Sequence, residues 1–321
     1  MPNIEQCRFA VLGSGALGGL YGAMLARAGH EVHFLLRSDY DHISRHGWKI
    51  ESHYGDFELP EVLAHESTHT MPACDVTIVS LKTTQNHLLP EMLRQTTKDG
   101  GLVLVFQNGL HVEEDAAAIV GPGRVLGGCC FLCSNKVGPG HIRHLDYGRI
   151  AFGEFDVTAQ GERAQNLRHL LSDAGIDAVV EQDLHSTRWR KLMWNIPFNG
   201  LSVVLNASTK DLVEDSHSLQ LAESLMAEVH HAANSCGANI PAEAIQHTIE
   251  VTKSMVPYDS SMRIDFLNQA PMEVEYMFGN PIRSAAKKGV SMPQVEMLYQ
   301  QLKFIDSING STGSRSGEVP G

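Results

Sequence analysis

The sequence predicts an α/β N-terminal domain followed by a mostly α-helical C-terminal domain. In the first half, short apolar runs of strand length alternate with amphipathic helical stretches, a pattern typical of a parallel sheet covered by helices. After residue 183, helical spacing prevails and β-branched runs are few. The 321 residues suffice for two ordinary domains. We place them at 1–182 and 183–306, followed by a Ser/Gly-rich tail at 307–321 that we expect to be disordered.

The elements of the N-terminal domain follow from these runs. Buried strands are expected at Arg8–Leu12, Val32–Leu36, Val76–Leu81, Leu102–Phe106 and Val125–Cys130. Helices are expected at Leu17–Ala28, Gln85–Leu93 and Val112–Val120. Antiparallel hairpins are expected around Trp48–Leu59 and His141–Gly153, and a last short strand at Ala178–Glu181.

Composition excludes several classes of protein. With 25 Lys and Arg against 37 Asp and Glu, the net charge of −12 disfavours a protein that binds the phosphate backbone of nucleic acids. The N-terminus lacks the pattern of a signal peptide, and no apolar run approaches the roughly 20 residues that span a bilayer. The six cysteines lie mostly in apolar segments, as reduced buried thiols do. We therefore expect a cytoplasmic protein that binds neither nucleic acid nor membrane.

A glycine-rich motif lies where the first expected strand meets the first expected helix. It reads Gly13-Ser14-Gly15-Ala16-Leu17-Gly18, the G-x-G-x-x-G of dinucleotide-binding loops. In such loops the first glycine allows a tight turn, the second lets backbone approach a pyrophosphate, and the third lets the helix pack closely on the strand. The surrounding strand–helix–strand order favours cofactor binding by a Rossmann-type domain over a structural turn.

Arg37 follows the second expected strand, where NAD enzymes have an acid for the ribose 2′-hydroxyl. A guanidinium suits a 2′-phosphate, which a carboxylate would repel. The sequence therefore predicts NADPH as the cofactor, with an ordinary surface arginine as the alternative.

With further motifs, the chain resembles the ketopantoate reductase (2-dehydropantoate 2-reductase) family over nearly all of residues 7–305. Besides the glycine motif, the resemblance rests on Leu81-Lys82-Thr83-Thr84-Gln85, Gln107-Asn108-Gly109, Arg188-Trp189-Arg190-Lys191 leading into Asn195 and Asn199, Ser260-Ser261-Met262, and Glu273. It implies a Rossmann domain, a helical second domain, and NADPH-dependent reduction of a 2-oxo acid in the cleft between them.

Three polar residues recur at helical spacing in an apolar segment of the second domain. Lys191, Asn195 and Asn199 stand at i, i+4 and i+8, which drift only about 40° per step around a helix. Burying a cation and two amides without partners is costly, and a substrate with a carboxylate and a carbonyl would supply partners. Lys191 is the expected general acid for the oxygen of the reduced ketone. The alternative is a lysine at a helix end beside asparagines that only bond between packed elements.

Four further residues complete the expected site. The family pattern implies Glu273 as the carboxylate that tunes Lys191 and accepts a hydrogen bond from a substrate hydroxyl. Ser261 is expected to bind the substrate carboxylate, unless it caps a helix. Asn108 and Lys82 follow expected strands, at the sheet edge where cofactors and substrates bind, unless they are ordinary loop residues.

Two residues depart from the expected pattern. Pro197 falls inside the polar helix, where it removes a backbone donor and is expected to kink the chain between Asn195 and Asn199. Thr209 stands where some members of the family have another substrate-contacting asparagine. Both leave Lys191 in place and leave the identity of the substrate open.

No metal site is expected. His65-Glu66-Ser67-Thr68-His69 matches the H-E-x-x-H pattern of zinc proteases, but the flanking Pro60 and Pro72 disfavour the helix that this pattern needs. Cys130 and Cys133 have no second cysteine pair, and Cys130 ends an apolar strand.

The prediction from the sequence is NADPH-dependent reduction of 2-dehydropantoate to pantoate. Two alternatives remain at this point: reduction of a different 2-oxo acid, and a non-catalytic NADPH-binding regulatory protein. A homodimer is expected only by analogy, because helical second domains often supply dimer surfaces.

Overall fold

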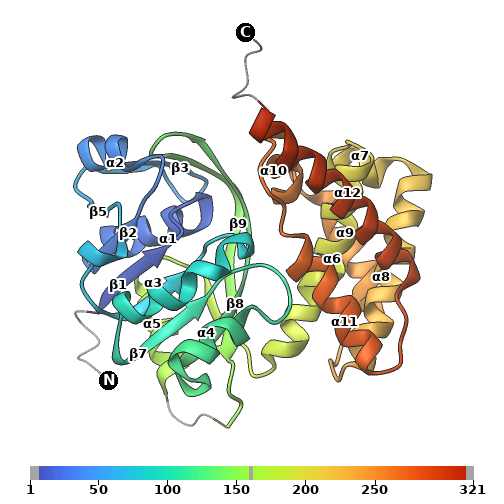
Figure 1. Cartoon of the computed structure of the whole chain (residues 1–321), viewed down its shortest axis with the longest axis horizontal. Helices are drawn as coiled ribbons and strands as arrows, with labels where there is room; N and C mark the ends of the chain where they lie inside the picture. The colour runs from blue at the N-terminus through green and yellow to red at the C-terminus, as the bar shows by residue number, and fades with distance from the viewer. Residues whose placement is uncertain (1–6, 159–161, 316–321) are drawn as a thin grey trace. The chain divides into compact units, whose positions relative to one another are not determined.

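The computed structural model describes residues 7–158 and 162–315, and these form two compact units (Figure 1). Unit 1 comprises the chain up to Gln107 together with Val112–Leu184. Unit 2 comprises Asn108–His111 and the chain from His185 onward. The short segment 108–111 is therefore part of the second unit although it lies within the sequence of the first.

Unit 1 is built on one ten-stranded sheet, in the order β4-β3-β9-β8-β7-β6-β1-β2-β5, with β10 beside β9. The strands are β1 (Arg8–Leu12), β2 (Glu31–Leu35), β3 (Trp48–Ser52), β4 (Phe57–Leu59), β5 (Leu63–His65), β6 (Cys74–Val79), β7 (Thr97–Val105), β8 (Val125–Gly138), β9 (His141–Glu154) and β10 (Ala178–Val180). The run β5-β2-β1-β6-β7-β8 is parallel throughout and has the strand order of a Rossmann fold. In such a sheet the ligand binds where the strand order reverses, which here is at β1.

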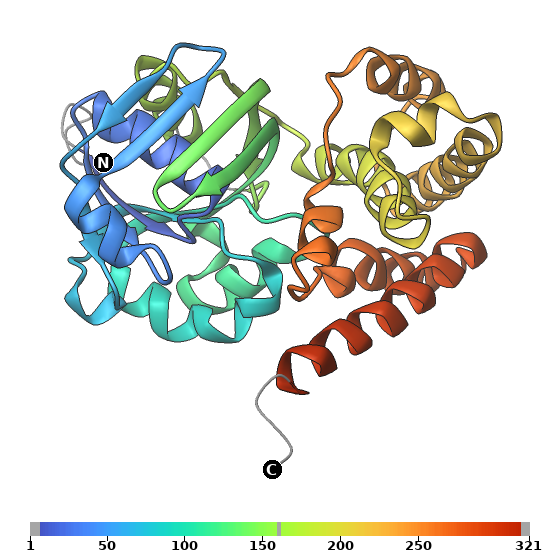
Figure 2. The ribbon, with the colours of Figure 1, turned by 90° about the horizontal axis from the view of Figure 1, so that it is seen from above.

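Helices cover both faces of this sheet. They are α1 (Ala16–Arg27), α2 (Tyr40–His46), α3 (Leu89–Thr96), α4 (Val112–Val120) and α5 (Arg163–Asp173), with short 3₁₀ turns η2 (Thr68–Thr70), η3 (Thr83–Leu88) and η4 (Pro122–Arg124). Figure 2 shows α1 on one face and the pair α3 and α4 on the other. Along β1, Phe9 and Val11 face the core that includes α1 and α5, as the two-residue repeat of a strand requires.

Unit 2 is helical. Its elements are α6 (Leu184–Val204), α7 (Thr209–Glu214), α8 (Ser216–Ser235), α9 (Glu243–Ser254), α10 (Ser261–Leu267), the π-helical turn η5 (Glu275–Gly279), α11 (Asn280–Lys287) and α12 (Pro293–Arg315). Its core brings together Trp189 and Phe198 of α6, Met226 of α8 and Leu302 of α12. The middle of α6 is thus surrounded by its own unit, and polar side chains there need partners.

The predicted fold class is confirmed, and three details of the prediction are wrong. No hairpin forms within His141–Gly153: β9 is one long strand, and its antiparallel partner is β8, which runs well beyond the expected end at Cys130. The turn of this hairpin is at Gly140, which has a φ of +62°. Residues Tyr147 and Gly148, inside the stretch expected as a hairpin, have positive φ values at an irregularity inside β9. The hairpin at Trp48–Leu59 pairs antiparallel as predicted.

The other two differences concern helices. The stretch expected as one helix at Gln85–Leu93 is the 3₁₀ turn η3 followed by α3, with Pro90 in the first turn of α3. The expected disordered tail from Ser307 is helical as far as Arg315, because α12 continues, and residues 316–321 lie outside the described residues. Extending a helix that is already anchored in a core adds a hydrogen bond per residue without a new nucleation step, and composition alone does not register this.

All six cysteines are free thiols, and all but Cys236 are buried. Among the helices of the described residues, none is long and apolar enough to cross a membrane.

Trp48 provides a test of how unit 1 is packed. Its side chain is 1% exposed, its ring lies 5.8 Å from that of Phe34, and its six-membered ring lies so close to Gly19 of α1 that a β-carbon there would be 2.9 Å away. We expect Trp48→Ala to lower the free energy of unfolding by about 3–5 kcal/mol, because it leaves a large cavity between the β3–β4 hairpin and α1. Urea unfolding measures this, and Trp48→Phe, which keeps an aromatic ring, should cost clearly less.

Candidate active site

The glycine loop has the geometry that its motif requires. Gly13 has a φ of +100°, and a β-carbon there would lie 2.4 Å from the backbone nitrogen of Leu81. At Gly18 a β-carbon would lie 2.3 Å from the carbonyl oxygen of Gly13. At Gly15, in contrast, a β-carbon would meet nothing within 4 Å. Two of the glycines are therefore needed for close packing inside the protein, and Gly15 leaves open space beside the loop.

The loop is held at the carboxyl ends of three adjacent strands. The Ser14 hydroxyl donates to the Leu35 carbonyl at the end of β2 (3.0 Å), and the Ser80 hydroxyl, just after β6, donates to the Gly13 carbonyl (2.8 Å). Helix α1 begins at Ala16, and no side chain caps its N-terminus. Its first N–H groups can therefore bind phosphate oxygens, which the helix dipole also favours. Ser80 has a supporting role that the sequence analysis did not identify.

Arg37 and Lys82 lie at the same edge of the sheet. Arg37 follows β2; its side chain is exposed and forms no hydrogen bond or ion pair with any residue in 7–158 or 162–315. Lys82 directly follows Leu81, whose backbone touches Gly13, and its side chain is half-buried. The structure therefore places the glycine loop, Arg37 and Lys82 at the carboxyl ends of β1, β2 and β6. These residues fit a dinucleotide with an additional phosphate.

In unit 2, α6 presents the three polar residues expected from helical spacing. It runs without interruption from Leu184 to Val204, so Pro197 does not end the helix between Asn195 and Asn199. Lys191 is half-buried, whereas both asparagines are buried. The spacing of four residues on a continuous helix places all three on one side of α6.

Asn199 connects α6 to the start of α10. Its side-chain oxygen accepts a hydrogen bond from the backbone N–H of Met262 (3.2 Å). One turn later on α6, Ser202 hydrogen-bonds through its hydroxyl to that of Ser260 (2.8 Å), which is fully buried. Because a backbone N–H can only donate, the first bond fixes the orientation of the Asn199 amide and leaves its NH₂ group to donate elsewhere.

The neighbouring serines have different roles. The Ser260 hydroxyl accepts from the Arg263 N–H and caps α10. Ser261 is therefore not the capping residue, and its own hydroxyl forms no hydrogen bond with the residues that the structure describes. The Asn195 side chain likewise has no hydrogen-bond partner in this part of the chain. Both groups remain able to bind a ligand.

Glu273 and Asn108 lie next to the π-helical turn η5. Glu273 is 4% exposed, and its carbonyl accepts from the Met277 N–H (3.3 Å). The segment that begins with Asn108 docks on the same turn: the Leu110 N–H donates to the Tyr276 carbonyl (2.9 Å), and a β-carbon on Gly109 would lie 2.7 Å from Tyr276. The half-buried Asn108 side chain has no hydrogen-bond partner among residues 7–158 and 162–315. Single π-helical turns occur frequently at functional sites.

The Asn108 segment is fixed further by α11. The Asn280 side-chain NH₂ donates to the Leu110 carbonyl (2.8 Å), and the His111 ring nitrogen Nε2 lies 2.7 Å from the Ser284 hydroxyl. His111 has a φ of +66°, unusual for a residue other than glycine. No pattern in the sequence identified Asn280, because its partner is 170 residues away.

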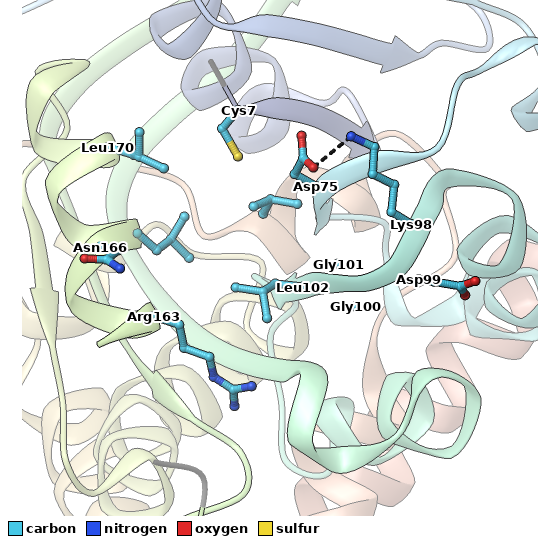
Figure 3. A pocket seen from close by; sticks show the side chains of 12 residues that line it. Cys7, Asp75, Lys98, Asp99, Gly100, Gly101, Leu102, Arg163, Asn166 and Leu170 are labelled. Atoms are coloured by element: carbon cyan, nitrogen blue, oxygen red, sulfur yellow. Dashed lines mark hydrogen bonds and ion pairs between the residues drawn. The ribbon is translucent and has the colours of Figure 1, made fainter. Parts of the chain in front are cut away.

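A cavity of about 340 Å³ in unit 1 lies at the amino ends of the parallel strands, opposite the ends that carry the glycine loop (Figure 3). It is lined by residues around the amino ends of β1, β6 and β7, including Cys7, Asp75 and Lys98, and by α5. Asp75 and Lys98 form an ion pair at 2.8 Å. Burial, and to a lesser extent the negative charge of Asp75, raises the pKa of the Cys7 thiol to about 11. Since dinucleotides bind at the carboxyl ends of parallel strands, this cavity is not the candidate cofactor site.

The segment that matches the zinc-protease pattern is not an α-helix. His65 ends β5, and His69 lies in the 3₁₀ turn η2. Within the described residues, no group of three or more His, Cys, Asp or Glu side chains is placed to hold a metal ion.

Two family models match the chain. One, described as ketopantoate reductase PanE/ApbA, matches residues 9–157, and the corresponding C-terminal model matches residues 183–306. A 2-dehydropantoate 2-reductase from Nostoc sp. is 50% identical over 310 residues, which cover 95% of this chain and 97% of that protein. The chain belongs to the ketopantoate reductase family. It is thus an oxidoreductase that acts on a ketone or the corresponding alcohol and depends on a pyridine nucleotide.

Solved structures agree with this assignment. The crystal structure of a 2-dehydropantoate 2-reductase from Geobacter metallireducens GS-15 is 39% identical, has a TM-score of 0.90, and covers 92% of this chain and 99% of its own. A D-mandelate dehydrogenase solved with NADH and anilino(oxo)acetate has a TM-score of 0.84 at 20% identity, over 94% of this chain and 99% of its own, and shows only that the fold is shared.

Gly15 provides a test of the cofactor loop. Its φ of −80° suits alanine and its surroundings are open, so we expect Gly15→Ala to leave the thermal stability of the free protein within a few degrees of the wild type. The added methyl group would stand where backbone must approach a pyrophosphate, so the affinity for the nicotinamide nucleotide should fall at least tenfold.

Fluorescence titration with reduced nucleotide measures this affinity. Gly123→Ala is the matched control, because a β-carbon at Gly123 also meets nothing within 4 Å and its φ is not positive. Unchanged nucleotide binding by Gly15→Ala would show that the pyrophosphate does not approach this loop.

Proposed function

We propose that this protein reduces 2-dehydropantoate to pantoate with NADPH, and that Lys191 is the general acid. The observation that supports this best is the continuous helix α6, which presents Lys191, Asn195 and Asn199 on one side of an otherwise apolar, largely buried segment. A polar row of this kind is costly to bury unless it binds a polar ligand. The 50% identity to a 2-dehydropantoate 2-reductase supports the choice of substrate.

Lys191 and Glu273 account for the proton in this reaction. When bound, the nicotinamide would supply the hydride for the keto carbon. As negative charge develops on the ketone oxygen, the Lys191 ammonium donates a proton to it and completes the hydroxyl group. Glu273, buried beside η5, is the proposed carboxylate that keeps Lys191 protonated between turnovers and accepts a hydrogen bond from a substrate hydroxyl.

Four neutral groups are proposed to orient the substrate. Asn199 has its side-chain oxygen committed to Met262, so its NH₂ group is available to a carbonyl or carboxylate oxygen. Ser261 and Asn195 have side chains without partners in the described part of unit 2, and we assign them to the substrate carboxylate and its neighbouring oxygens. Asn108, held on η5, is proposed to contact both substrate and cofactor.

NADPH is preferred over NADH because of the residues after β2. Arg37 is exposed and unpaired among the described residues, so its guanidinium can bind a 2′-phosphate in a bidentate manner. We assign the pyrophosphate to Gly13–Gly18 and one of the cofactor phosphates to Lys82.

A different 2-oxo acid is the second candidate substrate. Thr209 stands at a position where the family pattern has an asparagine in some members, and its hydroxyl donates to the Tyr258 carbonyl (2.6 Å) two residues before Ser260. The Thr209 hydroxyl therefore binds the loop before α10, and this position lacks the side-chain amide with which an asparagine would contact the substrate. The shared fold of a D-mandelate dehydrogenase is compatible with a substrate other than 2-dehydropantoate.

We also propose that the protein is a homodimer and that it is located in the cytoplasm. Met297, Phe304 and Ile308 are exposed at spacings that place them along one side of α12, which favours a homodimer. The free thiols of all six cysteines favour the cytoplasm.

Substitution of Lys191 tests the proposed acid. We expect Lys191→Ala to lower kcat by about 10²–10⁴-fold, the usual contribution of a general acid, and to change the dissociation constant of NADPH less than threefold. Stopped-flow oxidation of NADPH measures the first quantity and fluorescence titration the second. Arg190→Ala, one residue earlier and exposed, is the matched control and should keep kcat near the wild-type value. A wild-type rate for Lys191→Ala would exclude it as the acid.

Initial rates test the substrate and cofactor. We expect kcat/KM with 2-dehydropantoate to exceed that with pyruvate and 2-oxoisovalerate by at least a hundredfold, and to be higher with NADPH than with NADH, because the branched hydroxy acid uses more of the polar groups on α6 and α10. Equal rates for the three acids would favour the second candidate.

A further inference from the structure

Asp39 is an acid in an unexpected position for an NADPH enzyme. It lies two residues after Arg37, at the start of α2, and is only 7% exposed. An acid after the second strand is the group that binds the ribose 2′-hydroxyl in NAD enzymes, and it disfavours a 2′-phosphate. In this structure the Asp39 carboxylate is instead engaged by other residues of unit 1.

Lys136 is the main partner of Asp39. Its ammonium lies 2.9 Å from each carboxylate oxygen. The carboxylate also accepts hydrogen bonds from the Ser38 hydroxyl (3.0 Å) and the Gly140 N–H (3.3 Å). Burial acts to raise the pKa of Asp39, but the hydrogen bond and charge of Lys136, together with the hydrogen bonds from Ser38 and Gly140, outweigh it and lower this pKa. The pair is therefore an ionised one, and Lys136 neutralises the charge of Asp39.

The β8–β9 hairpin places Lys136 beside Asp39. Lys136 lies near the end of β8, and Gly140 forms the turn to β9. The Lys49 N–H donates to the Gly140 carbonyl (2.8 Å), and a β-carbon on Gly140 would be 2.8 Å from the Gly47 carbonyl oxygen. The hairpin tip is thus packed against the segment between α2 and β3, which holds Lys136 beside Asp39.

We propose that Lys136 is a selectivity residue for the coenzyme: by holding and neutralising Asp39, it leaves Arg37 free for a 2′-phosphate. This inference rests on the proposed use of NADPH. Arg37 forms no ion pair among residues 7–158 and 162–315, although a carboxylate lies two residues away. Without Lys136, Asp39 would compete for Arg37 and place an uncompensated negative charge near the bound phosphate. NADH, which lacks that phosphate, would be affected much less.

Three variants test the proposal: Lys136→Met, Asp39→Asn, and the double variant. The measured quantity is the ratio of the dissociation constants of NADH and NADPH, obtained by fluorescence titration without substrate. We expect Lys136→Met to lower this ratio at least tenfold, mainly by weakening NADPH binding. Asp39→Asn should keep the ratio at or above the wild-type value, and the double variant should return it to within threefold of wild type, because no carboxylate remains to be neutralised.

Lys98→Met is the matched control. It removes a lysine from another close pair in unit 1, with Asp75 at 2.8 Å, but at the opposite edge of the sheet. It should leave the ratio unchanged. If Lys136→Met does not fold, Lys136→Gln, which keeps a hydrogen-bond donor for Asp39 but removes the charge, takes its place and should also lower the ratio; an unchanged ratio in this variant would overturn the proposal.

Other outcomes overturn the inference. An unchanged ratio in folded Lys136→Met would show that Asp39 does not influence the coenzyme. A double variant that binds NADPH as weakly as Lys136→Met would show that the ammonium itself contacts the phosphate. A wild-type protein that binds both nucleotides equally would overturn the proposed use of NADPH, which is a separate result.

Discussion

A buried amide is costly unless it forms hydrogen bonds, and in unit 2 the hydrogen bond of Asn199 connects two elements of the candidate site. Asn199 lies on α6 with almost no exposure, and its side-chain oxygen accepts from the Met262 backbone. That bond, with the Ser202–Ser260 pair one turn away, sets where α10 begins. Because Ser260 caps the helix, Ser261 is left with a free hydroxyl within the described residues. The interactions that stabilise the helices thus also determine which polar groups remain available to a ligand.

Unit 1 depends on a different constraint, the absence of side chains at close approaches. Gly13 packs on the Leu81 backbone and Gly18 on Gly13 itself, so α1 can begin directly at the end of β1. These contacts leave space at Gly15 and an uncapped helix N-terminus, the two features that a phosphate group needs. Substitution at Gly13 and at Gly15 would therefore act on different quantities, the folding of the loop and the binding of its ligand.

Local patterns in the sequence were sufficient for the fold class and for the local geometry of two parts of the candidate site, the glycine loop and the polar row on α6. The glycine motif predicts its own backbone geometry, and the four-residue spacing of Lys191, Asn195 and Asn199 holds because α6 continues through Pro197. Long-range pairing could not be read in the same way. Strand β8 is the antiparallel partner of β9, and it also contains Lys136, the partner of Asp39. The Asp39–Lys136 pair spans 97 residues. A strand that mixes cysteines with polar residues, as β8 does, has no periodic signal that predicts its length.

The short loop after β7 is fixed by hydrogen bonds at both ends, to residues of unit 1 at one end and to residues of unit 2 at the other. Gln107 is fixed to unit 1 by hydrogen bonds from its side chain to the Leu81 carbonyl and to Asn86, whereas Leu110 is fixed to unit 2 by Tyr276 and Asn280. The chain between them consists only of Asn108 and Gly109, and Gly109 has a φ of +108° that other residues rarely adopt. Asn108 therefore follows a residue fixed in unit 1 and precedes residues of unit 2 that are bonded to η5 and α11. The backbone on each side of Asn108 is therefore fixed by hydrogen bonds, whereas its side chain has no hydrogen-bond partner among residues 7–158 and 162–315 and can bind a ligand.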